Sequence, residues 1–198
     1  MKIKVLSRST LKTLLENRGK ALEDVDFEYL KDIELLIDID PRKCLFISVN
    51  NYAAAPDFGW PTDPVTGLEC SPIPDDLLDR TLVLHFDDVT QGCIDAKYSP
   101  YKVFNKALAK QIVKFLNEKL TTDINMIVVH CTAGISRSGA IGTVLNDYYN
   151  RFLEENKSDW NYFNYAGHER VLSPNPTVSR YLRKELGMSY DDSAIDQD

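Results

Sequence analysis

Short runs of apolar residues alternate along the chain with longer segments that have the marks of helices. The apolar runs are typical of strands buried in a sheet, and they lie at residues 2–6, 44–49, 81–86 and 125–130. Helical spacing of apolar residues, or cap and stop residues, predict helices at residues 9–18, 24–37, 99–120, 137–155 and 176–186. Strands that alternate with helices predict an α/β fold, with a central, mostly parallel sheet of roughly four to five strands flanked by helices.

Two further segments are predicted from their turn-forming residues. Ser99 is a cap residue followed by Pro100 at a first helical position, so a helix is expected to begin there. Residues 50–76 are rich in Pro, Gly, Asn and Asp and are predicted to form a long loop. A loop of this length in a compact domain is often functional, but a plain surface excursion is an equal alternative.

Length and composition indicate one soluble globular domain. The chain has 198 residues, of which 43% are hydrophobic and 27% charged, and this suits a single domain with a real core. We expect that domain to span residues 1–190. The acidic tail, residues 191–198, is expected to be disordered.

The charge and the cysteines narrow the function classes. A net charge of −7 argues against a nucleic-acid partner or an anionic membrane surface. No apolar run approaches the roughly 18 residues of a membrane span, and the start lacks the features of a signal peptide. The four cysteines are too widely spaced for a CxxC metal site or a disulfide framework. We therefore expect a monomer of the reducing cytoplasm.

One segment carries recognisable chemistry, and it reads His130-Cys131-Thr132-Ala133-Gly134-Ile135-Ser136-Arg137-Ser138-Gly139. It joins the predicted strand 125–130 to the predicted helix 137–155, so it forms a loop at the carboxyl end of a strand, where open α/β sheets bind ligands. Backbone N–H groups at such a loop and at the start of the next helix form a nest for a phosphate-sized anion. The same nest favours the thiolate form of a cysteine within it.

Three residues of this loop have the properties that phosphoryl transfer needs. The thiolate of Cys131 can attack phosphorus, Gly134 permits a tight bend, and Arg137 can fork two phosphate oxygens. Taken alone, Cys131 would be better explained as a buried structural cysteine. The whole string at these offsets should occur by chance in roughly one chain per thousand or fewer, which favours the functional interpretation.

The segment resembles the His-Cys-x5-Arg-Ser/Thr signature of protein tyrosine and dual-specificity phosphatases, and it is most similar to the small dual-specificity-like group. The resemblance covers about residues 44–180 in element order and is highly specific only in residues 129–139. It implies the phosphatase fold, a parallel sheet flanked by helices. It also implies a hydrolase that needs no metal or other cofactor.

The resemblance also implies a role for each residue of the loop. Cys131 would form a phosphocysteine intermediate, and Arg137 would bind the phosphoryl oxygens. The hydroxyl of Ser138 would stabilise Cys131 as leaving group, and His130 would fix the loop. The phosphate would be cradled by backbone amides of Thr132, Ala133, Gly134, Ile135, Ser136 and Arg137.

The family takes its general acid from an aspartate after an upstream strand, and two neighbours compete for that role here. Asp87 and Asp88 follow the strand 81–86, and relatives with this pattern favour Asp88. Asn175 resembles a turn near the end of many such domains, so it is expected to close the domain and to buttress the phosphate loop. His85 is expected to be a hydrogen-bonded histidine of the strand rather than a catalyst.

The loop also bears on the substrate. Its variable residues Thr132, Ala133, Ile135 and Ser136 carry no charge, which favours a singly phosphorylated group over an inositol phosphate. We therefore expect a phosphorylated protein or peptide as substrate, with phosphotyrosine first and phosphoserine or phosphothreonine also open. The alternatives are a catalytically weak phosphate-binding module, a phosphatase of a non-protein ester, and a sulfur-transfer or arsenate-reducing enzyme.

Overall fold

The computed structural model describes residues 1–18, 39–52, 61–90, 101–153, 163–166 and 172–188. Within these residues, five parallel strands form one sheet in the order β3-β2-β4-β1-β5. The strands are β1 (Lys2–Ser7), β2 (Cys44–Asn50), β3 (Thr81–His85), β4 (Met126–Cys131) and β5 (Phe163–Ala166). The four predicted strands and the α/β class, with a parallel sheet flanked by helices, are confirmed.

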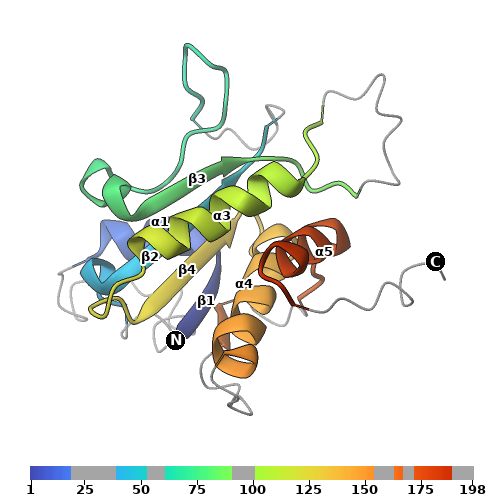
Figure 1. The fold of residues 1–198 in the computed structure, drawn as a ribbon. Coiled ribbons are helices and arrows are strands. Elements are labelled where there is room, and N and C mark those ends of the chain that lie inside the picture. The colour runs from blue at the N-terminus through green and yellow to red at the C-terminus, as the bar shows by residue number, and fades with distance from the viewer. Residues whose placement is uncertain (19–38, 53–60, 91–100, 154–162, 167–171, 189–198) are drawn as a thin grey trace.

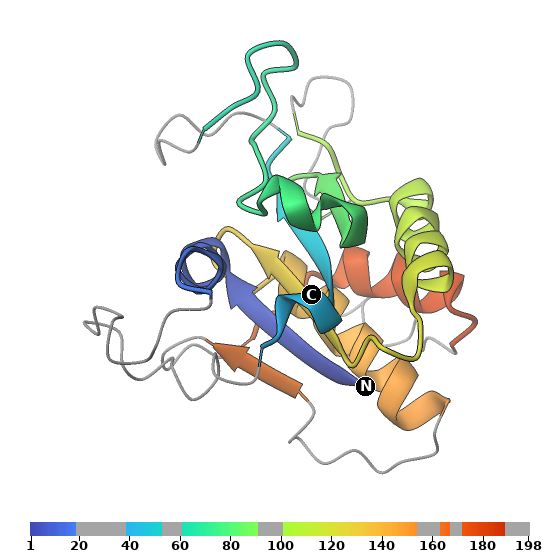
Figure 2. The same cartoon turned by 90° about the vertical axis from the view of Figure 1, so that its left-hand side faces the viewer.

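Helices cover both faces of this sheet (Figures 1 and 2). One face carries α1 (Arg8–Glu16) and the short 3-10 helix η5 (Asp75–Arg80). The other face carries α3 (Lys106–Lys119), α4 (Arg137–Asp147) and α5 (Pro176–Glu185), which pack against one another through α5. A 3-10 turn, η3 (Pro41–Lys43), leads into β2.

Side chains alternate between the two faces along each strand, as strand geometry requires. On β4, Val129 and Cys131 belong to the core under α3, α4 and α5, whereas Val128 belongs to the core under α1. His130 therefore faces α1, on the side of the sheet opposite to Cys131. One strand end thus sends a thiol to one face and an imidazole to the other.

The predicted start of α3 at Ser99-Pro100 is wrong. The helix begins at Lys106, and Asn105 caps it by accepting hydrogen bonds from the backbone N–H groups of Ala107 (2.9 Å) and Leu108 (3.2 Å). Residues 101–105 are not helical, because the backbone of Lys102 pairs with Asp87 instead. Its N–H donates to Asp87 Oδ2 at 2.8 Å and its carbonyl accepts from Asp87 N at 2.8 Å.

The other helix predictions agree with the structure where it describes them. In its described part, the predicted helix 137–155 forms α4 and continues to Phe152 as a π-helix, η7 (Tyr148–Phe152). β5 was not predicted, because four residues are too few for an alternating pattern to stand out. The predicted helix 24–37 and the tail 191–198 lie outside the described residues.

The predicted loop 50–76 is shorter in the structure, since Asn50 ends β2 and Asp75 begins η5. Its described part contains buried residues and is not a plain surface excursion. Residues 61–70 fold back on themselves through an isolated bridge between Thr62 and Glu69 (Figure 1). The bend is made at Asp63, whose carboxylate accepts from Thr66 N at 2.7 Å, and at Gly67, whose φ is +68°. The returning arm brings Glu69 into the protein, where it is 4% exposed.

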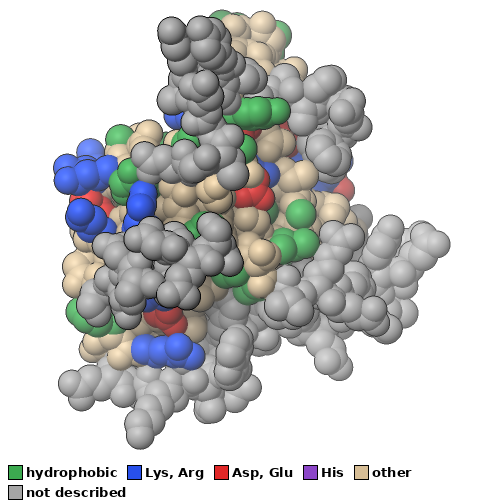
Figure 3. Space-filling model, turned by 90° about the vertical axis from the view of Figure 1, so that its right-hand side faces the viewer, with side chains coloured by type: hydrophobic (Ala, Val, Ile, Leu, Met, Phe, Trp, Pro, Cys, Tyr) green, Lys and Arg blue, Asp and Glu red, His purple; other side chains and the backbone are tan. Residues whose placement is uncertain are grey.

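On the face shown in Figure 3, lysine and arginine side chains of the described residues lie mostly toward one edge, and acidic side chains stand singly. None of the described helices is both long enough and apolar enough to cross a membrane.

The cap of α3 provides a test of the corrected boundary. Replacing Asn105 by Ala removes both capping hydrogen bonds and should lower the free energy of unfolding by about 1 kcal/mol, measured by urea denaturation. Asn105→Asp keeps an acceptor at the same place and should stay close to the unmodified protein. An equal loss in both variants would contradict the assignment of Asn105 as the cap.

Candidate active site

Cys131 ends β4, and its thiol is enclosed by the start of α4. The residue is 2% exposed, and Ser138 Oγ donates a hydrogen bond to Cys131 Sγ at 3.0 Å. Ser138 is itself fully buried in the first turn of α4. A hydroxyl donor stabilises negative charge on the sulfur that it faces. The structure thus brings together the two residues that the sequence pairs as nucleophile and supporting hydroxyl.

Gly134 lets the loop after β4 lie directly on the end of β1. Its φ is +72°, a left-handed conformation that favours glycine. A Cβ at this position would lie 2.6 Å from the backbone N of Ser7 and 2.8 Å from the carbonyl carbon of Leu6. No side chain fits there, so both backbone conformation and close approach require a glycine.

Arg137 is a buried cation whose described partners are all uncharged. It is 4% exposed, and its Nη1 donates to Asn51 Oδ1 at 2.8 Å and to the carbonyl of Phe86 at 2.9 Å. Its Nη2 donates to Thr132 Oγ1 at 3.1 Å, and its buried Nε has no hydrogen-bond partner among the described residues. A buried charge is costly unless it is paired. Arg137 therefore suits an anion that brings two oxygens to its Nε and Nη2.

Four other residues of the loop reach the surface of the protein. Thr132, Ile135 and Ser136 are partly exposed, and Ala133 is exposed. Ser136 is the N-cap of α4, but its hydroxyl does not bond the first turn of the helix. It donates instead to Asp88 Oδ1 at 2.7 Å, which joins the loop to the segment after β3.

The two competing aspartates lie in different surroundings. Asp87 is 6% exposed, and its carboxylate accepts from the backbone N–H groups of Tyr52 (3.1 Å) and Lys102 (2.8 Å). It therefore fixes the backbone around it. Asp88 is exposed, and it contacts the loop between β4 and α4 through Ser136. Of the two, Asp88 is therefore the aspartate whose side chain has a hydrogen bond to the loop.

Asn175 connects Asp88 to α5. Its Nδ2 donates to Asp88 Oδ1 at 3.0 Å, and its Oδ1 caps α5 by accepting from Thr177 N at 3.0 Å. Its backbone N also donates to the carbonyl of Ser136 at 3.3 Å. The expectation that Asn175 buttresses the loop agrees with these contacts.

Both described histidines that the sequence singled out are hydrogen-bonded. His85 contacts the backbone carbonyl of Glu69 through Nε2 at 2.9 Å, as expected for a structural histidine of the strand. His130 is fully buried, and its Nε2 lies 2.8 Å from Ser48 Oγ. Burial lowers the pKa of His130 to about 3, and the positive charges of Arg8 and Arg137 act in the same direction. The ring is therefore neutral at pH 7.

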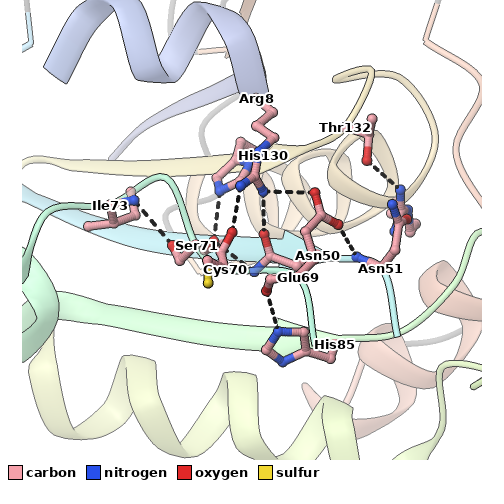
Figure 4. Close-up of polar contacts among 12 residues, drawn as sticks. Arg8, Asn50, Asn51, Glu69, Cys70, Ser71, Ile73, His85, His130 and Thr132 are labelled. Atoms are coloured by element: carbon pink, nitrogen blue, oxygen red, sulfur yellow. Dashed lines mark hydrogen bonds and ion pairs between the residues drawn. The ribbon is translucent and has the colours of Figure 1, made fainter. Parts of the chain in front are cut away.

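The sequence analysis did not identify the polar residues that connect to Arg137, namely Asn51, Glu69 and Arg8, which Figure 4 labels. Asn51 contacts Arg137, Glu69 contacts Asn51, and Arg8 pairs with Glu69. Asn51 follows the predicted strand 44–49 and Arg8 follows the strand 2–6, so polar residues at the carboxyl ends of parallel strands were an available signal. Glu69 had none, because it lies in the middle of a predicted loop.

The chain matches no family model, and comparisons with curated proteins and with solved structures found no match. The resemblance to phosphatases therefore rests on the loop itself and on the order of the elements. No group of three or more His, Cys, Asp or Glu side chains within the described ranges is placed to hold a metal ion.

The buried neutral His130 predicts how stability depends on pH. The pKa of this residue is about 3 in the folded state and about 6.5 in an unfolded chain, so between these values only the unfolded chain takes up the proton. This group should therefore lower the free energy of unfolding by about 1.4 kcal/mol per pH unit as pH falls below about 6.5, and should have no effect above it.

Urea denaturation between pH 7.5 and pH 5 would test this on the unmodified protein and on His130→Gln. The glutamine variant should show the shallower dependence on pH, by roughly 2 kcal/mol at pH 5. Identical slopes would mean that His130 takes up its proton in the folded protein.

Proposed function

We propose that the protein is a cysteine-dependent phosphatase with the dual-specificity-like fold, hydrolysing phosphate monoesters through a phosphocysteine intermediate. The observation that carries the proposal is the buried Arg137 beside Cys131. Among the described residues its guanidinium has only uncharged partners, and its Nε has none. A phosphate dianion supplies both the missing charge and the missing acceptors.

The contacts around the thiol support a reaction in two steps. In the first, Cys131 Sγ attacks phosphorus and the bond from phosphorus to the ester oxygen breaks. Asp88 gives its proton to the departing oxygen. In the second, water attacks phosphorus, its proton passes to Asp88, and the bond between sulfur and phosphorus breaks. Ser138, at 3.0 Å from the sulfur, stabilises the thiolate that leaves.

Arg137 and the loop amides would stabilise the charge that builds on the phosphoryl oxygens during both steps. Thiolate, guanidinium, amides and carboxylic acid together supply a nucleophile, charge stabilisation and a proton. The reaction therefore needs no metal or other cofactor. A working thiolate also requires a reducing compartment, for which we propose the cytoplasm, and Cys44, Cys70 and Cys131 are free.

The substrate that fits best is a singly phosphorylated side chain of a protein or peptide, with phosphotyrosine first. The outward loop residues Thr132, Ala133, Ile135 and Ser136 offer no positive charge for additional phosphates. Phosphoserine and phosphothreonine are open to the same chemistry. We propose that the protein acts as a monomer, without a nucleic-acid or membrane partner.

The other function classes have less support. A pure phosphate-binding module has no need of a carboxylate held at the loop, yet Asp88 is held there by Ser136 and Asn175. Arsenate reduction needs a second thiol close to the first. Cys44 lies level with Met126, five residues before Cys131 on β4, and so roughly 16 Å away. Burial also raises the pKa of the Cys44 thiol to about 12.

Replacing the nucleophile gives the first test of this proposal. The unmodified protein should hydrolyse an aryl phosphate in the presence of a metal chelator, and Cys131→Ser should abolish turnover. The same variant should still bind vanadate or phosphate, because Arg137 and the loop remain, and calorimetry would measure this. Cys70→Ser, which changes a free cysteine outside the loop, should keep its activity. Comparable turnover in Cys131→Ser would overturn the assignment of the nucleophile.

The aspartates give the second test, through the leaving group. Asp88→Asn should slow hydrolysis of phosphotyrosine by about 10²-fold or more, because a phenol needs a proton as it departs. It should slow much less an ester whose leaving group departs as a stable anion. Steady-state rates on both esters would show the contrast.

Asp87→Asn is the matched control. It should leave the dependence on the leaving group unchanged and lower the free energy of unfolding by about 1–3 kcal/mol, since one of two buried backbone donors loses its acceptor. If Asp87→Asn showed the leaving-group effect and Asp88→Asn did not, the roles of the two residues would be exchanged.

A further inference from the structure

Arg137 is held on one side by a chain of contacts that leads away from Cys131. Its Nη1 donates to Asn51 Oδ1 at 2.8 Å, and the backbone N–H of Asn51 donates to Glu69 Oε2 at 2.7 Å. Both contacts join segments that are far apart in the sequence. Asn51 follows β2, and Arg137 begins α4. Glu69 lies in the segment 61–74 between β2 and η5, which we call the arm. Asn51 thus connects the arm to the guanidinium. Figure 4 shows Asn51 next to Glu69, with Arg8 beyond it.

Glu69 is a buried carboxylate whose charge is balanced by Arg8. Glu69 Oε1 lies 3.0 Å from Arg8 Nη1, and the two side chains are 5% and 4% exposed. Arg8 also donates to Asn50 Oδ1 at 2.8 Å and to the carbonyl of Cys70 at 2.5 Å. The contact is an ion pair without an aligned hydrogen bond, since Glu69 Oε1 has no hydrogen-bond partner among the described residues. The hydrogen bonds to Asn50 and Cys70 fix the Arg8 guanidinium, and Glu69 stays beside it because a displacement would leave a buried charge unpaired.

The intervening amide has a chemical consequence. A carboxylate placed directly on Arg137 would fix the guanidinium but also neutralise it, and so would compete with a phosphate. The uncharged oxygen of Asn51 holds Nη1 without cancelling its charge. Together with the carbonyl of Phe86, it occupies Nη1 and leaves Nε without a partner among the described residues.

We propose that the buried Arg8–Glu69 ion pair is a positioning device for Arg137, acting through Asn51. This inference rests on the proposed phosphatase function, and it makes Asn51 and Glu69 positioning residues rather than catalytic ones. Asn51 orients the guanidinium toward the phosphoryl oxygens, and Glu69 fixes the backbone that carries Asn51.

The same arm also reaches the residue before the nucleophile. Ser71 Oγ lies 2.8 Å from Ser48 Oγ, and Ser48 Oγ lies 2.8 Å from His130 Nε2. Asn50 Nδ2 donates to Ser48 Oγ at 3.2 Å, which joins this branch to Arg8. The arm 61–74 therefore supports both sides of the loop.

A double-mutant cycle tests the proposal, with Asn51→Ala, Arg137→Lys and the two combined. The readouts are kcat/KM on an aryl phosphate and the inhibition constant of vanadate. Asn51→Ala should lower kcat/KM and raise the inhibition constant by about 10-fold or more, as expected for a lost hydrogen bond to a charged group. In the Arg137→Lys background the same change should have less than about a threefold effect, because the group that it positions is gone.

The inhibition constant separates positioning from simple loss of structure. Partial unfolding lowers the amount of active protein and leaves that constant unchanged, whereas a misdirected guanidinium weakens vanadate binding in every molecule. Glu69→Gln is the second variant, and it should weaken vanadate binding in the same direction. Glu16→Gln, which changes an exposed glutamate of α1, is the matched control and should alter neither readout.

Three outcomes would decide the matter. Coupling between Asn51 and Arg137, together with weaker vanadate binding in Glu69→Gln, supports the proposal. Additive effects of Asn51→Ala and Arg137→Lys in an active enzyme overturn the positioning role and leave the phosphatase function intact. An unmodified protein that neither hydrolyses the ester nor binds vanadate overturns both.

Discussion

The buried guanidinium of Arg137 has no negatively charged partner among the described residues, and the arrangement of the site depends on this charge. Arg137 is held by an amide oxygen, a backbone carbonyl and a hydroxyl. These dipoles hold the guanidinium in place but leave its net charge uncompensated, a state that is tolerated only where the surrounding structure enforces it. The proposed function would use the same charge, since a phosphate bound at the site would neutralise it. Stability and proposed activity thus place opposite demands on one side chain.

The parallel sheet meets these demands by separating two sets of residues at the carboxyl ends of its strands. Alternation along β4 directs Cys131 toward α4, where Ser138 contacts it, and His130 toward α1, where Ser48 contacts it. The register between β1 and β4 places Ser7 beside Cys131, so that Arg8 begins α1 at the level of the loop. Cys131 and the buried polar residues around His130 therefore lie at the same end of the sheet, on opposite faces.

Neighbouring aspartates illustrate how finely the tertiary structure divides chemical roles. Asp87 accepts two backbone hydrogen bonds and is buried, whereas Asp88 is exposed and contacts Ser136 and Asn175. The two residues are neighbours in the chain, yet Asp87 is buried and fixes the backbone, whereas Asp88 is exposed and contacts the loop. The phosphatases that the loop resembles favour the second aspartate, Asp88. The residue types alone do not distinguish the two positions.

Local patterns in the sequence predict the class of fold, and the motif alone suggests the chemistry proposed for the loop. Buried strands and amphipathic helices are local patterns, so the four main strands and the last two helices could be predicted. The residues of the motif lie close together in the sequence and could be assigned together, namely Cys131, Gly134, Arg137 and Ser138. The folded structure was needed to place the start of α3 at Lys106, to add β5 to the sheet, and to connect Arg8 and Glu69 to Arg137 through Asn51. These features depend on contacts between residues far apart in the sequence, and such contacts leave no periodic pattern. A glutamate in a Pro-rich and Gly-rich segment looks like any solvated charge until the chain folds and its partners bury it.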